Sequence, residues 1–388
     1  MKINPKSIVV IYIIFFLAFG SAGNLMAFHN GGTGYCEGCH TMHNSSNGSV
    51  ITPTIGNALT KGSDASSTCL ICHSGKTEGY HVKSDDGSNF TGGGDFYWLT
   101  KTFTWNVDGA SNVSSGDNHG HNIIAVDYSF TQDATLNTAT GGTYSSAFLG
   151  CTSCHDPHGK KNNGTMGGYS AIEVSGSYCA DPTLQVTGNY RLLGDIGYFS
   201  GSGNAFVNDV PIARAVDLSS GPESNSNHTD YGQGMSEWCS NCHGSYSGVG
   251  NRHPSGNSEQ LSNDNIYINY NLYVKTGDFS GTHETSFLAL VPFERGTNDP
   301  TTLTPTSTIG PNASSNVMCL SCHRAHASAF ENAARWDMSA EFISNSHPMA
   351  GDGAVTGDDV LNSYYGRDMI SQFGNFQRGL CNKCHAMD

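Results

Sequence analysis

Twelve of the thirteen cysteines of this chain occur in pairs, and every pair has the same local pattern. Two residues separate the cysteines of a pair, and a histidine follows the second cysteine directly. The six copies are Cys36-Glu-Gly-Cys39-His40, Cys69-Leu-Ile-Cys72-His73, Cys151-Thr-Ser-Cys154-His155, Cys239-Ser-Asn-Cys242-His243, Cys319-Leu-Ser-Cys322-His323 and Cys381-Asn-Lys-Cys384-His385. At this spacing two thiols can add to the two vinyl groups of one porphyrin, and the next residue places an imidazole beneath the iron. The pattern predicts six covalently bound haem c groups, each with one iron.

Zinc and a redox-active dithiol are the alternative uses of paired cysteines. A structural zinc site usually takes four ligands from two separated pairs, which would leave the histidine after each pair unexplained. A thioredoxin-like dithiol needs only one copy in a compact fold. A chain of this composition would produce about 0.02 such motifs by chance, whereas this chain contains six. Haem attachment therefore accounts best for the thiols and the histidine together.

The histidines outside the motifs indicate whether the irons are open or capped. An iron with an open face binds small molecules, whereas an iron capped on both faces mainly exchanges electrons. Eleven histidines remain for this role: His29, His43, His81, His119, His121, His158, His228, His253, His283, His326 and His347. Six irons need only six of them, so the sequence favours histidine on both faces of every iron. Methionine is the alternative second ligand and would raise the reduction potential; the methionines nearest to motifs are Met42, Met235 and Met318.

Three of these histidines, His43, His158 and His326, stand three residues after a motif histidine. Two imidazoles so close in sequence project to similar sides of a local turn, so they cannot reach opposite faces of one iron. Each is therefore predicted to ligate another haem and to tie neighbouring porphyrins together. A turn-capping or surface histidine is the alternative.

The first twenty-seven residues have the pattern of a secretory signal peptide. Lys2 and Lys6 precede an apolar run from Ser7 to Phe19, and small and neutral residues follow as far as Ala27. We expect cleavage after Ala27, with an uncleaved N-terminal anchor as the alternative. No later segment approaches twenty consecutive apolar residues, so no membrane span is expected in the mature chain. The sequence thus predicts export through the periplasm to the outer surface or the medium.

The composition of the mature chain is acidic and poor in apolar side chains. Loss of the leader removes two lysines and no acids, which changes the formal net charge from −15 to −17. Haem propionates add further negative charge, so a nucleic-acid partner is electrostatically disfavoured and cationic partners or metal oxides fit better. With 48 glycines and only 37% hydrophobic residues, the chain needs porphyrin to supply buried apolar area.

Periodicity is weak along most of the chain, and glycine-rich turn signals fill the intervals between motifs. The predicted fold is a multihaem c-type cytochrome of mostly coil and turns, with few short helices and strands around a chain of haems. Short helices are expected within 327–336 and 364–380, and strand-like pieces within 96–107 and 265–274. We expect one elongated domain over 28–388; a split near 219–227 is the alternative.

Several segments outside the bare motifs resemble one known family. They are GYCEGCHTMHNS (34–45), GGDFYWLTKTFTWNV (93–107), GHNI (120–123), CTSCHDPHGK (151–160), YGQGMSEWCSNCH (231–243), CLSCHRAHAS (319–328), YYGRDM (364–369) and RGLCNKCHAMD (378–388). They resemble the hexahaem outer-surface cytochromes of metal-reducing bacteria, which polymerise into extracellular nanowires. The resemblance runs from Phe28 to the C-terminus and covers every motif.

This resemblance implies a filament with two histidine ligands on each of six haems, stacked in alternating parallel and T-shaped pairs. It contributes to the selection of His81, His121 and His253 as second ligands, beside the three named above. It also implies that His43 crosses the subunit boundary and ligates the haem on Cys319, Cys322 and His323 of the adjacent protomer. His119, His228 and His283 lie in stretches without a visible family counterpart, and the segment 337–360 differs from the family in length and content. Together with His29 and His347, these histidines are expected to be surface residues or supports for ligands.

Cys179 is the unpaired cysteine and has no family counterpart either. A lone thiol in an oxidising compartment is either buried and inert, capped, or used in an intermolecular disulfide. The inert alternative is favoured.

The sequence therefore predicts an electron conduit and no enzyme. Electrons would move along the haem chain and across subunit junctions, from partner cytochromes to external acceptors such as metal oxides or electrodes. Two alternatives stay open: a multihaem reductase with one open iron, and a monomeric periplasmic electron shuttle.

Overall fold

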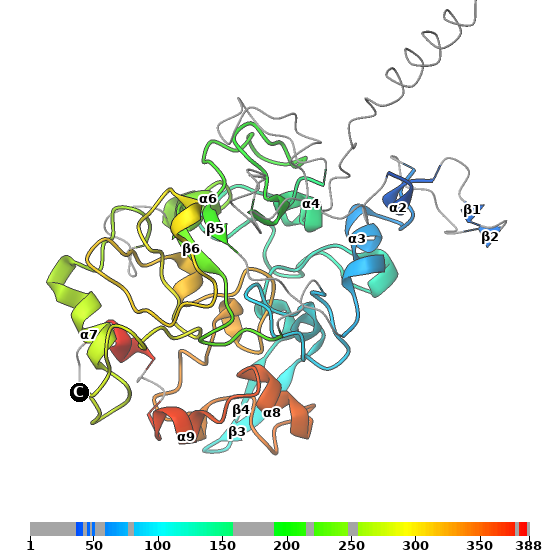
Figure 1. Ribbon diagram of the computed structural model, residues 1–388. Coiled ribbons are helices and arrows are strands. Elements are labelled where there is room, and N and C mark those ends of the chain that lie inside the picture. Colours follow the sequence, from blue (N-terminus) through cyan, green and yellow to red (C-terminus); the bar gives the residue numbers. More distant parts are fainter. Residues whose placement is uncertain are drawn as a thin grey trace, which may run out of the picture.

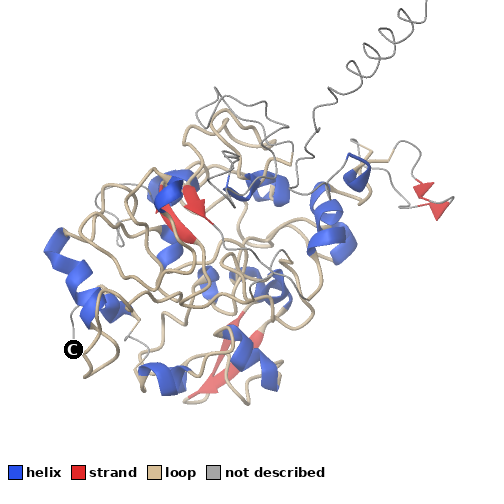
Figure 2. Cartoon of the chain, viewed as in Figure 1, coloured by secondary structure: helices blue, strands red, loops and turns tan. Residues whose placement is uncertain are grey.

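The computed structural model describes residues 36–41, 45–46, 49–50, 59–76, 81–157, 190–214, 221–246, 255–376 and 380–385. The leader, His29, His43, His158, His253, Met42 and Cys179 lie outside these ranges. Loops dominate the described part, and short elements are scattered among them (Figures 1 and 2). The fold is thus mostly coil, as predicted.

The helices are short, and several coincide with attachment motifs. They are α2 (Cys36–Cys39), α3 (Ala65–His73), α4 (Cys151–Cys154), α6 (Met235–Cys239), α7 (Ile266–Leu272), α8 (Gly357–Ser363) and α9 (Met369–Phe373). Single 3-10 turns are η1 (Phe96–Thr100), η2 (Gly116–Asn118), η3 (Val126–Tyr128), η4 (Ser146–Phe148), η6 (Tyr190–Leu192), η8 (Gly244–Tyr246), η9 (Asn263–Asn265), η10 (Pro300–Thr302), η11 (Cys319–Ser321), η12 (Glu331–Ala333), η13 (Ile343–Asn345) and η15 (Cys381–Lys383). Within the described ranges, none of the helices is long and apolar enough to cross a membrane.

The strands form three separate two-stranded antiparallel pairs. They join β1 (Ser45–Ser46) to β2 (Ser49–Val50), β3 (Phe103–Val107) to β4 (Ala110–Ser114), and β5 (Ile212–Arg214) to β6 (Asp230–Gln233). The longest pair, β3–β4, is a hairpin in which Val107 faces Ala110. Its two-residue turn, Asp108-Gly109, has positive φ at both positions, as the tight hairpin turn requires.

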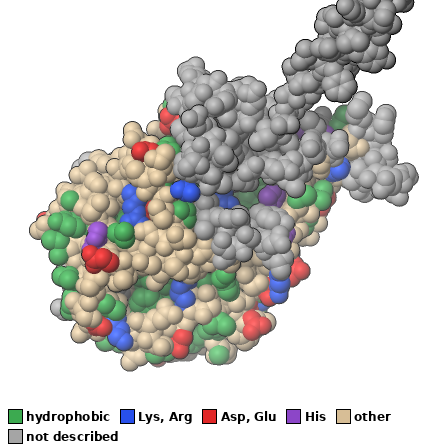
Figure 3. Space-filling model, in the orientation of Figure 1, with side chains coloured by type: hydrophobic (Ala, Val, Ile, Leu, Met, Phe, Trp, Pro, Cys, Tyr) green, Lys and Arg blue, Asp and Glu red, His purple; other side chains and the backbone are tan. Residues whose placement is uncertain are grey.

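Aromatic side chains build much of the protein core. Trp98, Phe103, Tyr270, Phe287 and Phe293 are each at most 2% exposed and belong to one large cluster. A large aromatic ring buries more apolar area than an aliphatic side chain. A few aromatics thus supply a core despite the low hydrophobic fraction, and on the surface polar and charged atoms intersperse with apolar ones (Figure 3).

Two of the four expected elements differ from the prediction. Residues 265–274 were expected as strand but form helix α7, and 327–336 contain only the single turn η12. The strand expected within 96–107 is present in the second half of this range as β3, whereas the first half forms η1. The helix expected within 364–380 is present as α9. Helix α7 is fixed by contacts with the C-terminal motif: Asn269 Nδ2 donates to the carbonyls of Asn382 and Lys383. Tertiary contacts here override β-propensity.

Candidate haem-attachment sites

Each motif occupies one helical turn or the end of a short helix. In the third to sixth motifs the histidine N–H donates to the carbonyl of the first cysteine, at 2.9 Å for His155 and 3.0 Å for His243. In a helical turn, positions i, i+3 and i+4 lie on one face. The backbone therefore presents both thiols and the imidazole to the same side, which is what attachment to one porphyrin requires.

Local hydrogen bonds explain why these turns form. Asp64 caps α3 by accepting from the N–H of Ser67 at 2.8 Å. The serine inside the third motif, Ser153, accepts from the N–H of Gly150 at 2.9 Å. Ser321 in the fifth motif accepts likewise from Met318 at 3.2 Å. These two motifs thus carry their own cap for the turn.

Adjacent motifs lie next to one another in chain order. A hydrogen bond with Cys151 joins the second motif to the third and, with burial, raises the pKa of Cys69; the charge of Cys39 in the first motif adds to this rise. Burial and then the charge of Cys242 raise the pKa of Cys154 to about 12, which relates the third motif to the fourth. Each of the first three motifs is thus related to the next one along the chain.

The same relationship continues to the C-terminus. A hydrogen bond with Cys319, followed by burial, raises the pKa of Cys239, so the fourth and fifth motifs touch. Burial and then the charge of Cys322 raise the pKa of Cys384 to about 12, which relates the fifth motif to the sixth. Figure 1 agrees: α2 and α3 lie at one side of the molecule, and α7 with the C-terminus lies at the opposite side.

One serine contact recurs between the motif pairs. The N–H of Cys151 donates to Ser66 Oγ at 3.0 Å, and the N–H of Cys319 donates to Ser236 Oγ at 3.0 Å. Ser66 and Ser236 each stand three residues before the first cysteine of the preceding motif. The second and third motifs are therefore joined in the same way as the fourth and fifth. Sequence analysis missed this repeat, although the serine at a fixed offset was a visible signal.

Two pairs of imidazoles face each other at a distance that fits one metal between them. The ring centres of His121 and His243 are 5.9 Å apart, and those of His155 and His326 are 6.3 Å apart. A metal–imidazole bond of about 2 Å on each side places the two nitrogens about 4 Å apart and the ring centres about 6 Å apart. Each pair combines a motif histidine with a histidine that was predicted to be a second ligand.

Backbone hydrogen bonds leave Nε2 of these rings available. Nδ1 of His121 lies 2.7 Å from the carbonyl of Ala325, that of His155 lies 2.7 Å from Arg191, and that of His243 lies 2.8 Å from Thr140. Nδ1 of His323 has the same contact with Asn332 at 2.8 Å. A ring that donates from Nδ1 presents a lone pair at Nε2, the usual arrangement of a metal ligand.

Burial favours the neutral form of His121, His155 and His326. Burial lowers the pKa of His155, and it lowers the pKa of His326 to about 3. For His121, burial and then the neighbouring charge of His243 lower the pKa. Because only the neutral imidazole can ligate a metal, this environment favours ligation.

No protein-family model matches the chain. The C-type cytochrome OmcS of Geobacter sulfurreducens is 42% identical over 420 aligned positions, which cover 95% of this chain and 96% of the relative. The chain belongs to the OmcS family of c-type cytochromes. A structure titled cryo-EM of the OmcS nanowires matches with a TM-score of 0.78 and 41% identity, covering 91% of this chain and 98% of that chain. The Outer Membrane Cytochrome S filament, also from Geobacter sulfurreducens, matches with a TM-score of 0.72 and 38% identity over 93% and 100% of the two chains.

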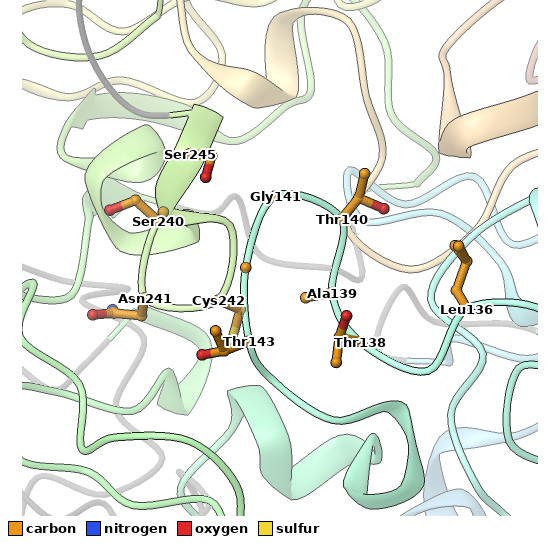
Figure 4. A pocket seen from close by; sticks show the side chains of 12 residues that line it. Leu136, Thr138, Ala139, Thr140, Gly141, Thr143, Ser240, Asn241, Cys242 and Ser245 are labelled. Carbon is orange, nitrogen blue, oxygen red and sulfur yellow. The ribbon is translucent and has the colours of Figure 1, made fainter.

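As in other c-type cytochromes, haem is bound covalently in the OmcS family. In this chain, glycines allow the backbone to lie close to an attachment site. Gly141 and Gly142 carry the loop that brings the Thr140 carbonyl to His243. A Cβ at Gly142 would meet the Cys242 carbonyl oxygen at 1.7 Å, and one at Gly141, where φ is +71°, would meet Tyr246 at 2.3 Å. Figure 4 shows this loop beside Cys242, where both line an open pocket. Only glycine allows the backbone to approach the attachment site this closely.

Glycines also place the two predicted second ligands, His121 and His326. A Cβ at Gly120 would meet the His326 carbonyl oxygen at 2.3 Å, and one at Gly94 would meet the Ala327 carbonyl oxygen at 2.0 Å. The N–H of His121 donates to the His326 carbonyl at 2.9 Å. A backbone hydrogen bond thus joins His121 to His326. The ring of His121 lies near His243, and the ring of His326 lies near His155.

His119 and His228, which were not expected to be ligands, have other partners. Nε2 of His119 lies 2.9 Å from Ser114 Oγ, and its Nδ1 lies 3.0 Å from the Trp98 carbonyl. His228 has both ring nitrogens on carbonyls, those of Thr229 and Ser307, at 3.0 and 2.9 Å. Because both ring nitrogens of each histidine contact protein atoms, both rings have a structural role. Both side chains are buried, whereas a surface position was one of the two expectations.

The remaining candidates are placed as follows. His347 stacks on Trp105 with ring centres 3.9 Å apart, and its Nδ1 contacts Asp352 at 2.7 Å. His283 is exposed. His81 lies next to Gly75, two residues after the second motif. The possible methionine ligands Met235 and Met318 are buried, at 4% and 1% exposure, in an apolar cluster of the protein.

Two of the tryptophans make contacts within the protein. Trp98 lies against Tyr97 and Phe103 in the core. Trp238 donates from Nε1 to the Gly194 carbonyl at 2.8 Å.

Proposed function

We propose that this protein conducts electrons along six haem c groups and polymerises into an extracellular filament. The observation that carries the proposal is the series of six attachment motifs, in which each motif lies beside the next in chain order. Bound haem supplies an iron that accepts and passes on single electrons. A haem at every motif would then give a path for electrons from one end of the subunit to the other.

The protein's part is to hold and cap the irons. The proposed attachment residues are the twelve paired cysteines, and the proposed proximal ligands are His40, His73, His155, His243, His323 and His385. The proposed second ligands are His43, His81, His121, His158, His253 and His326. His121 would share an iron with His243, and His326 would share one with His155, as the ring distances of 5.9 and 6.3 Å support. On this assignment His326 serves another haem than its neighbour His323.

A capped iron supports electron transfer without turnover of a substrate. A multihaem reductase would need one iron that keeps an open face. Carbon monoxide added to the reduced protein tests this: we expect no large change in the Soret band, and a large change at one haem or more would favour the reductase. Mass spectrometry of the mature chain should show six added haem masses.

Polymerisation is supported by the two matching structures, which are those of OmcS nanowires and of an Outer Membrane Cytochrome S filament. We propose that His43 ligates the haem of the fifth motif in the adjacent subunit. In His43→Ala all six haems should be attached, while electron microscopy should show subunits and short pieces only. The matched control is His283→Ala, which removes an exposed histidine and should leave filaments of normal length. Normal filaments in His43→Ala would exclude the junction role.

We propose one elongated unit over 28–388, exported by the leader and assembled outside the cell. Partner cytochromes would supply electrons, and the acceptors would be metal oxides or electrodes. The mature net charge of −17 favours cationic surfaces and disfavours nucleic acid.

A further inference from the structure

Glu294 is fully buried, at 0% exposure, between the fourth and fifth attachment motifs. Its Oε1 accepts from the N–H of Met235 at 2.7 Å, at the start of α6, which ends at Cys239. Its backbone pairs with Asn316, which stands three residues before Cys319, through hydrogen bonds of 3.0 and 2.8 Å. The backbone and the carboxyl group of Glu294 are thus each held by a residue that stands shortly before one of the two motifs.

Three oxygen atoms at this place need a proton donor. Within the described part of the chain, Glu294 Oε2, Glu237 Oε2 and Asn316 Oδ1 are buried and have no hydrogen-bond partner. Glu294 and Asn316 are a hydrogen-bonded antiparallel pair, so their side chains leave the same face. A proton on Glu294 Oε2 would turn that oxygen into a donor with Asn316 Oδ1 as a near acceptor. Unpaired buried acceptors are costly, and a proton on Glu294 Oε2 would give both oxygens a partner.

The charged and titratable groups around Glu294 also favour the protonated form. Burial raises the pKa of Glu294 to about 8; the charges of Glu237 and Cys319 add to the rise, whereas hydrogen bonds with the Met235 N–H and the Asn316 side chain oppose it. Cys239, which also feels the charge of Glu294, and Cys319 carry no titrating thiol once haem is attached. Arg295, the next residue, is paired with Asp230 at 2.8 Å. No cation in this set neutralises the carboxylate.

We propose that Glu294 is a redox-linked proton site, which takes up a proton when an electron arrives at the fourth or fifth haem and releases it when that electron leaves. The inference rests on the proposed electron-transfer function. The balance is one electron added to the ferric iron and at most one solvent proton added to the carboxylate; oxidation returns both. Glu237, whose charge acts on Glu294, is only partly buried, and its Oε1 accepts from the Asn257 N–H at 2.7 Å.

The sign of the coupling follows from electrostatics. An added electron makes the site one unit more negative, and the low dielectric of the interior screens it weakly. The proton affinity of Glu294 is therefore higher in the reduced protein than in the oxidised one. Since protons then favour reduction, the midpoint potential of the neighbouring haems must fall as the pH rises.

Spectroelectrochemical titration of the holoprotein between about pH 6 and pH 10 tests the proposal. In the wild type, the midpoint potential of part of the haem signal should fall as the pH rises. The fall is at most a tenfold change in the one-electron equilibrium per pH unit, or about 59 mV. Glu294→Gln keeps the size and the acceptor for Met235 but cannot titrate, so this part of the shift should disappear. The control Glu284→Gln removes an exposed carboxylate, and this variant should show the same pH-dependent shift as the wild type. An unchanged pH dependence in Glu294→Gln overturns the proposal.

Infrared difference spectra of the wild type give an independent measurement. Reduction at a pH near the transition should increase a protonated-carboxyl band that shifts in D₂O and is absent in Glu294→Gln. The same band in the variant would also overturn the proposal. Haem mass and the absorbance spectrum, recorded on each sample, separate this failure from failure of the proposed function, which would show as missing haem.

Discussion

Lys383 lies inside the sixth attachment motif, and its Nζ donates a hydrogen bond of 2.7 Å to the backbone carbonyl of Tyr270 in α7. It donates a second bond of 2.6 Å to the carbonyl of Tyr273, just beyond the end of this helix. The last carbonyls of a helix have no partner within the helix. The motif therefore caps α7, and burial lowers the pKa of Lys383 to about 8.

Replacement of Lys383 by methionine keeps the length of the side chain and removes the donor. We expect a loss of about 1 to 3 kcal/mol in the free energy of unfolding, since the buried carbonyls lose their partner. Urea unfolding followed by circular dichroism measures this loss. Lys275→Met, at a partly exposed lysine, is the control and should be close to wild type. Equal stability of the two variants would show that the Lys383 contacts contribute nothing.

His119 and His121 allow a matched test of the ligand assignment, because both are histidines on one short segment. His121→Ala should leave one iron in six without its second ligand, since His121 faces His243 at 5.9 Å. The reduced variant should bind carbon monoxide at one haem and show high-spin iron by electron paramagnetic resonance of the oxidised form.

His119→Ala should leave the haem spectrum unchanged, because both ring nitrogens contact protein atoms. Its effect should appear as a loss of roughly 1 to 3 kcal/mol in unfolding free energy, as the Trp98 carbonyl and Ser114 lose a buried partner. Carbon monoxide binding by the His119 variant in place of the His121 variant would reverse the assignment.

The attachment motifs could be predicted because their chemistry depends on spacing within one helical turn. Positions i, i+3 and i+4 share a face whatever the rest of the fold does, so local sequence determined the arrangement of Cys151, Cys154 and His155. The choice of His326 as a second ligand rested on its position three residues after His323, whereas the choice of His121 rested partly on the family resemblance. Which motif each of them faces became visible only in the structure.

Long-range contacts explain what sequence analysis could not provide. Residues 266–272 have β-branched and aromatic side chains, yet they are helical because Lys383 and Asn382 bind them from the other end of the chain. The burial of Glu294 likewise depends on α6 and Asn316, which are distant in sequence. An isolated glutamate or Ile-Tyr-Ile segment carries no sign of such partners.

Gly142 tests how closely the glycine loop must approach the fourth motif. Alanine there would place its Cβ 1.7 Å from the Cys242 carbonyl oxygen, so the loop must move and the contact between Thr140 and His243 should be lost. We expect a loss of about 1 to 3 kcal/mol in unfolding free energy and a changed spectrum of one haem. The control Gly244→Ala has nothing within 4 Å of the new Cβ and should behave as wild type. A Gly142→Ala protein with wild-type stability and spectrum would show that the loop adapts freely.

Glu223 balances buried arginines beside the fifth motif. Arg324 Nη1 lies 2.9 and 3.0 Å from its two carboxylate oxygens, and Arg335 Nη1 lies 3.4 Å from Oε1. The side chains of Glu223, Arg324 and Arg335 are 7%, 2% and 0% exposed. Burial alone would raise the pKa of Glu223, but the charges of Arg324, Arg335 and Arg367 together hold it below its ordinary value.

Glu223→Gln removes the only carboxylate of this ion cluster and leaves the guanidinium charges uncompensated. We expect a loss of about 3 to 5 kcal/mol in the free energy of unfolding near neutral pH. The control Asp85→Asn breaks an ion pair with Lys83 in which the acid is 86% exposed, and such surface pairs contribute little. Chemical unfolding of both variants and the wild type measures the difference.

The pH dependence of this loss has a definite sign. Because the folded pKa of Glu223 is lowered, its contribution is complete above the unfolded pKa of about 4.5 and is lost as the pH falls through the folded pKa. The stability gap between wild type and Glu223→Gln should therefore be widest at neutral pH and should narrow in acid, where the wild-type carboxyl is protonated and as neutral as glutamine. A gap that is constant with pH would mean that the variant acts through packing and not through the charge of Glu223.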